Sequence, residues 1–314
     1  MIGYEALRER AAYLNLAGRG KIKASGEDRA RLLHAMTTNH IQNLAPGGGC
    51  YAYFLTAQGR ILADVNVFCR PDHFLLDTEP ETRAKIFEHL DKFIIADDVV
   101  VEDLTAEMAT IAVEGPEAAA VLTRIGAPTP ERDFENSEWG RCLVCRVSYT
   151  GGPGYFVFVP AGERDALITR LAAAGAEAAD EQAFRTVRIE NGRPRYGEEI
   201  SERYLAQETN QPRALHFQKG CYLGQEIVER VRSRGQVHRV LVPVTIDTAD
   251  APAAGTILTA DDQKAGEIAS AAYSPASGKS VALAYIRTEL AKLGRQLMLG
   301  EFVAHVTGGV HGVC

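Results

Sequence analysis

The stretch HFQKGCYLGQEIVERVRSRGQVHR, residues 216–239, concentrates a thiol, ammonium and guanidinium groups, and glycine turns in a short piece of chain. Cys221 precedes an apolar and charged run at 227–231, which predicts a helix whose first turn begins at Gln225. A thiol close to a helix N-terminus and two residues from Lys219 is expected to favour the thiolate. A free cysteine is more often a small buried hydrophobic residue. The residues alone leave both interpretations open.

Strands and helices alternate through the region upstream of this stretch. Alternating apolar runs predict strands at 20–24, 51–56, 61–68, 73–77, 99–101, 110–113, 139–148 and 155–159. Helical spacing predicts helices at 5–14, 29–36, 81–93, 116–125, 163–174 and 181–190, the second of them preceded by a capping box at 25–28. Interleaved hairpins and helices of this kind predict an α+β fold with antiparallel sheet.

The sequence changes character downstream of the opening stretch. Short strands bounded by Gly, Pro, Asp and Ser are predicted at 240–246, 256–258, 265–272 and 280–286, a pattern typical of a small β-barrel. We therefore place the main domain boundary near Gly235. The expected domains are 1–235, an α+β region of two interleaved lobes with the inner lobe near 48–105, and 236–314, a C-terminal β-barrel.

Bulk composition narrows the class of protein. A net charge of −7 over 314 residues argues against stable nucleic-acid binding, although arginines gather locally at 230–239. The N-terminal MIGYEALRER argues against a secretory segment, and no apolar run reaches membrane-spanning length. Six cysteines are too few for a disulfide scaffold. We therefore expect a protein without a membrane partner that lies in the cytoplasm, or in an organelle matrix if a targeting segment has been removed.

Two patterns that suggest metal or covalent chemistry are better explained by ordinary structure. Cys142 and Cys145 form a CxxC pair, but residues three apart on a strand face opposite sides, and no second pair completes a zinc site. None of the eight histidines shows HxxxH spacing or a partnered serine, so neither a metal site nor a hydrolase triad is predicted. The loop TGGPGY, 150–155, fits either a hairpin turn or a close backbone approach.

Two carboxylates outside the opening stretch stand where they suit ligand binding. Asp64 lies on a β-rich run, on the face opposite Ala63 and Val65, where it is either solvated or directed into a cleft. Glu190 ends a predicted helix that closes with a glycine cap at Gly192. A negative charge is unfavourable at a helix C-terminus, which favours a purpose such as holding a ligand amide or amine.

Several motifs together resemble the folate-binding superfamily of the glycine-cleavage aminomethyltransferase, the T-protein. They are GRILAD at 59–64, YTGGPGY at 149–155, RTVRIENG at 185–192 with YGEEI at 196–200, and the barrel segment 266–286. Within this superfamily, KGCYLGQE at 219–226 is similar to the YgfZ family, because aminomethyltransferases usually carry no cysteine there. Ala63 stands where the T-protein often has a first aspartate, which weakens the case for retained aminomethyl transfer.

The resemblance implies an aminomethyltransferase-like fold, with three lobes around a central cavity, and a bound reduced folate such as tetrahydrofolate. It places Asp64, Glu190 and Tyr196 at the folate site. Carboxylates suit the donor-rich edge of a pterin. Arg230 and Arg239, together with Arg232 and Arg234, are expected either to attract the folate's glutamate tail or an acidic partner, or to be solvated.

The YgfZ resemblance implies a folate-binding accessory protein that assembles or repairs iron–sulfur enzymes, including ones that thiolate tRNA, with iron–sulfur client or assembly proteins as partners. Cys221 is the expected catalytic thiolate, and Lys219 is expected to favour its formation. One alternative is an aminomethyltransferase-like one-carbon enzyme, in which Asp64 is essential and Cys221 incidental. The other is a non-catalytic folate-sensing scaffold.

Overall fold

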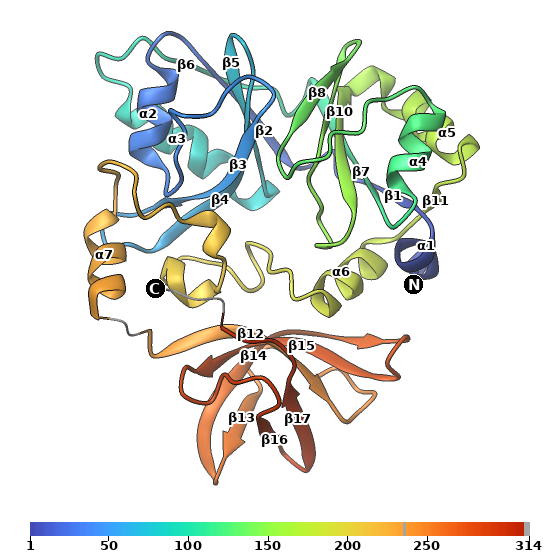
Figure 1. Cartoon of the computed structure of the whole chain (residues 1–314), viewed down its shortest axis with the longest axis vertical. Helices are drawn as coiled ribbons and strands as arrows, with labels where there is room; N and C mark the ends of the chain where they lie inside the picture. The colour runs from blue at the N-terminus through green and yellow to red at the C-terminus, as the bar shows by residue number, and fades with distance from the viewer. Residues whose placement is uncertain (235–236, 311–314) are drawn as a thin grey trace. The chain divides into compact units, whose positions relative to one another are not determined.

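The computed structural model describes residues 1–234 and 237–310, and Figure 1 labels its helices and strands. The chain divides into two compact units. Unit 1 comprises Met1–Ala57, Leu62–Phe184 and Arg213–Leu223, and unit 2 comprises Gln58–Ile61, Arg185–Pro212 and Gly224–Cys314. The domain boundary predicted near Gly235 lies outside the described residues.

The first sheet of unit 1 has two faces of different chemistry. Its strand order is β3 (Gly49–Leu55), β4 (Ile61–Cys69), β5 (His73–Thr78), β2 (Gly20–Ser25) and β6 (Val100–Asp103). Ala63, Val65 and Val67 of β4 pack in an apolar core with side chains of α2 (Arg29–Met36) and α3 (Arg83–Phe93). Because side chains alternate along a strand, Asp64 and Asn66 lie on the opposite face, which we call the polar face.

The second sheet of unit 1 contacts the polar face of the first. Its strand order is β11 (Glu177–Ala178), β1 (Ala12–Asn15), β7 (Met108–Glu114), β10 (Gly154–Pro160), β9 (Cys142–Cys145) and β8 (Asn136–Trp139). Helices α4 (Ala118–Arg124) and α5 (Arg164–Ala173) supply apolar side chains to its core. The rings of Phe68 on β4 and Phe158 on β10 meet edge to face, with centroids 5.7 Å apart. Polar groups between the two sheets are therefore shielded from water.

Three local predictions in unit 1 are wrong. The helix predicted at 5–14 ends early, because α1 covers only Tyr4–Glu9 and β1 then pairs with β7. The strand predicted at 139–148 is a hairpin, β8 and β9, which turns at Gly140 with a φ of 60°. The capping box does not form, since Asp28 accepts a hydrogen bond from the backbone N–H of Asp98 at 2.9 Å instead of capping α2. In the first and third cases a partner distant in sequence overrides the local pattern, whereas the hairpin follows from a local turn at Gly140.

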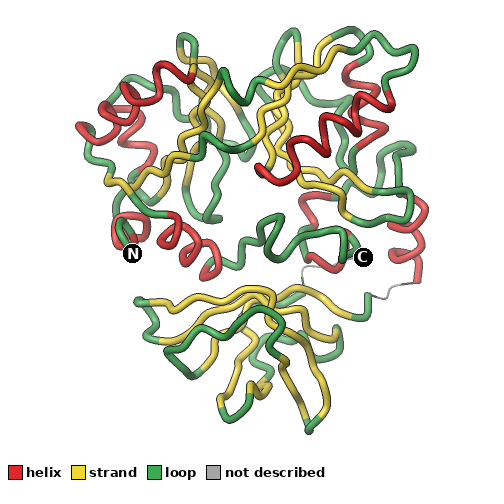
Figure 2. Tube along the Cα trace, turned by 180° about the vertical axis from the view of Figure 1, so that it is seen from behind, coloured by secondary structure: helices red, strands yellow, loops and turns green. Residues whose placement is uncertain are grey.

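Unit 2 contains helix α7 (Gln225–Arg234), most of α6 (Glu181–Glu190) and the C-terminal barrel. The barrel closes in the order β12 (Arg239–Ile246), β15 (Lys279–Arg287), β14 (Gln263–Ser274), β13 (Ile257–Ala260), β16 (Gln296–Leu299) and β17 (Phe302–Val306). Figure 2 shows these strands joined by loops. The predicted α+β class and C-terminal barrel are confirmed, although β16 and β17 were not predicted.

Membrane insertion by a helix finds no support in the described residues, where every helix is too short or too polar to cross a bilayer.

Candidate functional site

Asp64 lies on the polar face and is buried, with 8% of its surface exposed. The phenol of Tyr51, on the neighbouring strand β3, donates a hydrogen bond to Asp64 Oδ2 at 2.8 Å. Burial and the Asp64 carboxylate raise the pKa of Tyr51, so the phenol keeps its proton and remains a donor. The guanidinium of Arg213 lies over the Tyr51 ring, 4.5 Å from its centroid. Asp64 is therefore an oriented buried acceptor rather than a solvated carboxylate.

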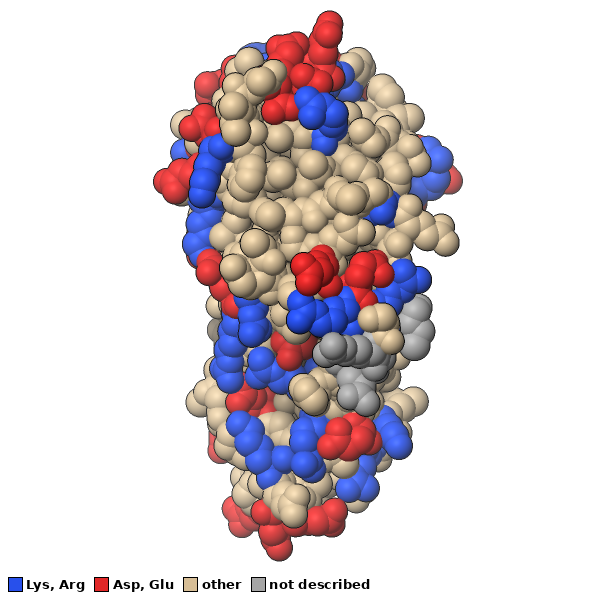
Figure 3. Space-filling view, turned by 90° about the vertical axis from the view of Figure 1, so that its left-hand side faces the viewer, with Lys and Arg blue, Asp and Glu red and all other residues tan. Residues whose placement is uncertain are grey.

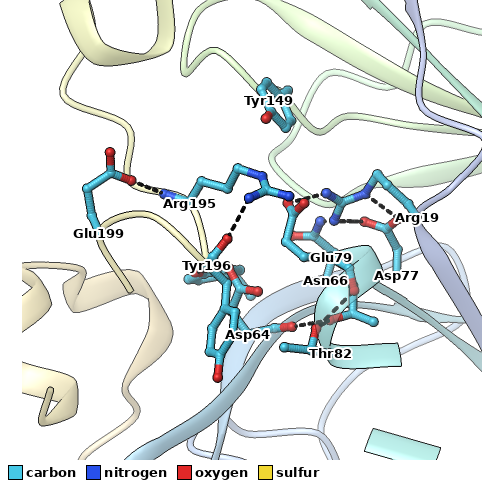
Figure 4. A network of polar contacts seen from close by, with 12 residues as sticks. Arg19, Asp64, Asn66, Asp77, Glu79, Thr82, Tyr149, Arg195, Tyr196 and Glu199 are labelled. Atoms are coloured by element: carbon cyan, nitrogen blue, oxygen red, sulfur yellow. Dashed lines mark hydrogen bonds and ion pairs between the residues drawn. The ribbon is translucent and has the colours of Figure 1, made fainter. Parts of the chain in front are cut away.

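A row of polar side chains crosses three strands beside Asp64. The strand register places Asn66 opposite Asp77 on β5, and Asp77 opposite Lys21 on β2. Asn66 Nδ2 donates to Asp77 Oδ2 at 2.8 Å, and Arg19 donates from Nε and Nη2 to the two Asp77 oxygens, also at 2.8 Å (Figure 4). All of these side chains are buried. The polar face is thus held rigid before any ligand arrives.

Cys221 lies on the short segment where the chain leaves unit 1, which ends at Leu223. Its side chain is exposed, whereas Cys50 and Cys142 are half-buried and Cys69 and Cys145 are buried. The backbone N–H of Leu223 donates to Ala35 O on α2 at 3.0 Å. The segment therefore holds the thiol at the surface of unit 1 close to the last turn of α2.

Lys219 is buried beneath this segment, with 6% of its surface exposed. Its ammonium donates to the carbonyl oxygen of His34 at 2.6 Å and also to that of Thr37, so it caps the C-terminus of α2. Burial lowers the pKa of Lys219 to about 7, while the helix carbonyls and the Tyr222 ring, 4.6 Å from Nζ, favour the charged form. Its predicted effect on the Cys221 thiol stays a prediction.

Three histidine rings gather beside Lys219. The ring centroids of His34 and His40 are 4.5 Å apart, and those of His40 and His216 are 5.3 Å apart. Burial, together with Lys219 and the two neighbouring rings, lowers the pKa of His34 to about 4. Sequence spacing gave no signal for this cluster, because His216 comes from a distant part of the chain. Across residues 1–234 and 237–310, no His, Cys, Asp or Glu side chains are arranged to hold a metal ion.

Glu190 and Tyr196 lie in unit 2, Glu190 as the last residue of α6 and Tyr196 in the loop that follows. Gly192 has a φ of 68°, and the N–H of Arg193 bonds to Arg188 O at 2.8 Å, which confirms the predicted glycine cap. Tyr196 is 5% exposed. Their contact with a folate stays a prediction.

A buried ion pair fixes the loop around Tyr196. Arg188 is 1% exposed, and its Nη1 donates to both carboxylate oxygens of the fully buried Glu199 at 3.0 Å. The phenol of Tyr285 on β15 donates to the backbone carbonyl of Glu199 at 2.9 Å. The charged residues of RTVRIENG and YGEEI therefore join α6, its loop and the barrel within unit 2.

Arg230 and Arg232 lie on α7 and pair with acidic side chains of the same helix. Arg230 contacts Glu226 at 3.1 Å and Arg232 contacts Glu229 at 3.5 Å, with all four side chains solvated. Figure 3 shows such mixing of basic and acidic side chains over one face of the molecule. The side chain of Arg234 lies outside the described part. Of the two expectations for these arginines, solvation rather than attraction of a ligand therefore describes Arg230 and Arg232.

Arg239 has a different setting at the start of the barrel. Its Nε donates to Glu208 Oε1 at 3.0 Å, and its guanidinium lies 4.8 Å from the centroid of the Tyr204 ring, which stacks on Tyr285. Arg239 also lines a cavity of about 190 Å³, together with Lys264, Gly266, Glu267, Tyr285 and Arg287. Its guanidinium is therefore held in place by Glu208 and the Tyr204 ring, and the Glu208 carboxylate already neutralises its charge.

The TGGPGY loop is held by Glu114 at the end of β7. The carboxylate is fully buried and accepts hydrogen bonds from Ser148 Oγ and from the N–H of Thr150, both at 3.0 Å. Burial raises the pKa of Glu114, while these donors oppose the shift. A Cβ atom on Gly154 would lie 2.8 Å from the Glu114 side chain. The close-approach interpretation of this loop is therefore supported at Gly154.

Comparison with known proteins agrees with this architecture. Residues 3–219 match the family described as the GCVT N-terminal domain, and residues 239–311 match the glycine cleavage T-protein C-terminal barrel domain. The aminomethyltransferase of Rubrobacter xylanophilus is 30% identical over 293 residues, which cover 91% of this chain and 78% of that protein. A chloroplastic protein of Arabidopsis thaliana, named as a transferase, is 26% identical over 304 residues, covering 95% of this chain and 70% of that protein.

A solved structure shares the fold over nearly the whole chain. The glycine cleavage system aminomethyltransferase T of Bartonella henselae superposes with a TM-score of 0.89 at 21% identity, covering 97% of this chain and 87% of that chain. At this identity the likeness concerns the fold alone. The aminomethyltransferase-like fold expected from the sequence is confirmed.

Proposed function

This chain belongs to the GCVT family, and we propose that it binds a reduced folate, tetrahydrofolate, at the polar face of unit 1. The observation that carries this proposal is the buried carboxylate of Asp64, oriented by the Tyr51 phenol. A reduced pterin offers several N–H donors, and a carboxylate in a low-dielectric setting accepts such donors strongly. The acceptors of the polar face therefore suit the group that the family membership implies.

The other residues predicted to contact the folate support this proposal to different degrees. Glu190 and Tyr196 remain predicted folate contacts on the basis of motif positions. Arg239 is the better candidate to bind an anionic tail or partner, because it lines a cavity with Lys264 and Arg287, of which Lys264 pairs with Glu267 in the same cavity. Arg230 is the weaker candidate, since it is solvated and paired with Glu226.

We further propose a function of the YgfZ type, in which the folate-bound protein assists the assembly or repair of iron–sulfur enzymes, tRNA-thiolating ones included. The support is KGCYLGQE itself and the exposure of Cys221 on a segment anchored by Lys219. A thiolate acting on an iron–sulfur client or a partner thiol has to be accessible. Cys221 meets this requirement better than the other cysteines of the described residues.

Aminomethyl transfer is the second candidate function. It is favoured by the 30% identity to a relative that is named an aminomethyltransferase and extends over most of both chains. In this case Asp64 would be the essential group, and Cys221 could be replaced without loss. Folate-dependent release of ammonia from an aminomethylated carrier protein would identify this activity.

Calorimetric titration of the purified protein with tetrahydrofolate tests the shared premise. We expect binding by the unaltered protein and an affinity at least tenfold lower for Asp64→Ala, because the oriented acceptor is lost. Asp72→Ala, which removes an exposed carboxylate from the turn before β5, should bind normally. Absence of heat up to high micromolar tetrahydrofolate would contradict every version of the proposal.

Complementation tests the role of Cys221. In a strain lacking the protein, Cys221→Ala should fail to restore iron–sulfur enzyme activity, whereas Cys142→Ala, at a half-buried cysteine, should restore it. Both variants should be present at normal abundance. Full restoration of iron–sulfur enzyme activity by Cys221→Ala would rule out a role for the Cys221 thiol. The transferase and the folate-sensing scaffold would then be the remaining candidate functions.

A further inference from the structure

Asn66 shares the polar face with Asp64 and carries a polar atom that nothing else in the described chain satisfies. The two residues are separated by one position on β4, so their side chains point to the same side. Asn66 is 6% exposed. Its side-chain oxygen, Oδ1, is buried and has no hydrogen-bond partner among residues 1–234 and 237–310.

The orientation of the Asn66 amide is fixed by its neighbour. Asp77 carries a carboxylate that is held by two donors of Arg19, each at 2.8 Å. A carboxylate in such an ion pair only accepts hydrogen bonds. Asn66 must therefore turn its NH₂ group toward Asp77, as the 2.8 Å contact from Nδ2 records, and its carbonyl oxygen away from Asp77.

The donors nearest to the row have other partners. The third nitrogen of the Arg19 guanidinium, Nη1, bonds to Glu79. Lys21 Nζ donates to the backbone carbonyl of Ala17 at 2.8 Å, and the Tyr51 phenol donates to Asp64. A buried acceptor without a donor is unfavourable for the folded protein. Such a group persists where a ligand or a bound water supplies the donor.

We propose that Asn66 Oδ1 accepts a hydrogen bond from an N–H group of the bound folate ring, beside the donors taken by Asp64. Asn66 is then a specificity-determining residue, because it adds a neutral acceptor at a fixed place next to a charged one. A ring system that carries two separated N–H donors satisfies both residues, whereas one with a single donor leaves one of them unpaired. The inference rests on the proposed folate binding and extends it to Asn66.

Asn66→Leu tests this assignment, since leucine has nearly the same volume and lacks the carbonyl. We expect tetrahydrofolate affinity, measured by calorimetry, to fall about 5- to 30-fold. The Tm of the ligand-free variant should fall less than that of a buried asparagine bonded at both ends of its amide, because the substitution breaks only the bond from Nδ2 to Asp77 and also removes an unsatisfied acceptor. The tetrahydrofolate-induced rise in Tm should shrink accordingly. If the Asn66→Leu protein does not fold, Asn66→Ala is the second variant, because alanine requires no extra space.

Asn136→Leu is the matched control in the same unit. Asn136 is 4% exposed, and both ends of its amide are satisfied, since Oδ1 accepts from Arg70 at 2.6 Å and Nδ2 donates to Gly48 O at 2.8 Å. Without ligand this variant should have a lower Tm than the unaltered protein, and its affinity for tetrahydrofolate should be unchanged.

The outcomes separate the inference from its premise. Failure of the unaltered protein to bind tetrahydrofolate would overturn the proposed function, and the assignment of Asn66 with it. Binding by the unaltered protein with equal affinity in Asn66→Leu and Asn66→Ala would overturn the Asn66 assignment alone. A ligand-free Tm lowered in Asn66→Leu as far as in Asn136→Leu would also overturn it, because Oδ1 would then have a donor in the free protein.

Discussion

The phenol of Tyr51 donates a 2.8 Å hydrogen bond to Oδ2 of Asp64 across neighbouring strands β3 and β4. Both side chains are buried, with exposed fractions of 5% and 8%. The bond fixes the plane of the carboxylate, and burial together with the Asp64 charge raises the pKa of Tyr51 so that the donor is not lost by ionisation. Asp64 is therefore preorganised as an acceptor before a ligand binds.

Tyr51→Phe should weaken tetrahydrofolate binding by about tenfold, because Asp64 loses the donor that orients it. We also expect the free energy of unfolding to fall by about 1–3 kcal/mol, the usual effect of leaving a buried acceptor unsatisfied. Calorimetry and urea denaturation measure the two effects. Tyr155→Phe, at a buried tyrosine of the second sheet, is the control and should keep its affinity. Unchanged affinity in Tyr51→Phe would show that Asp64 needs no orientation by the phenol.

Arg188→Met should destabilise unit 2 by about 3–5 kcal/mol, because it leaves the carboxylate of Glu199 buried without its charged partner. Arg164→Met removes the exposed pair with Asp165 and should change stability far less, because solvent screens this pair. Urea denaturation of the two variants gives the comparison. Equal effects would mean that the Arg188 pair adds no more than a surface contact.

Acidification should destabilise the protein through His34. Burial lowers the pKa of His34 to about 4 from an ordinary value of 6.5, so between these values the unfolded chain binds a proton that the folded protein does not. The stability contribution is complete above pH 6.5 and falls by up to about 3 kcal/mol as the pH drops to 4. Urea denaturation at several pH values measures this slope. His34→Gln should reduce the dependence of stability on pH, whereas His238→Gln, at an exposed position, should leave this dependence unchanged.

Cys221 should react first with a thiol reagent under native conditions. Among the cysteines of the described residues it alone is exposed, and Cys145 is fully buried. Iodoacetamide labelling followed by mass spectrometry, in a Cys314→Ser background, should therefore modify Cys221 well before Cys145. Labelling of both residues at the same rate would mean that the second sheet opens often enough to expose Cys145 before the reagent has consumed the Cys221 thiol.

Much of the fold could be predicted from local patterns. The alternation in ILADVNVFC separates Ala63, Val65 and Val67 from Asp64 and Asn66, and the structure places the first set in the core and the second on the polar face. The glycine cap at Gly192 and the start of α7 at Gln225 follow from equally local signals. These features depend on neighbours along the chain, which the sequence presents directly.

Two of the errors arose where a distant partner decides the local structure. Residues 12–15 form a strand because β7 offers them an edge, and Asp28 leaves its predicted cap for the Asp98 backbone. Lys219 illustrates the same limit at the candidate site. The sequence placed it two residues from Cys221, whereas the structure directs its ammonium into the carbonyls at the end of α2.

The sequence by itself determined the class of fold, the barrel, the face of β4 that carries Asp64, and the motif that contains Cys221. Only the tertiary structure decided the hydrogen bond from Tyr51 to Asp64, the Arg19 clamp on Asp77, the unsatisfied oxygen of Asn66 and the histidine cluster beside Lys219. The physical reason is the distance in sequence between the residues that interact. Periodicity and capping are set by interactions over a few residues, whereas burial of a polar group and its choice of partner are set by strands and segments that meet only after folding.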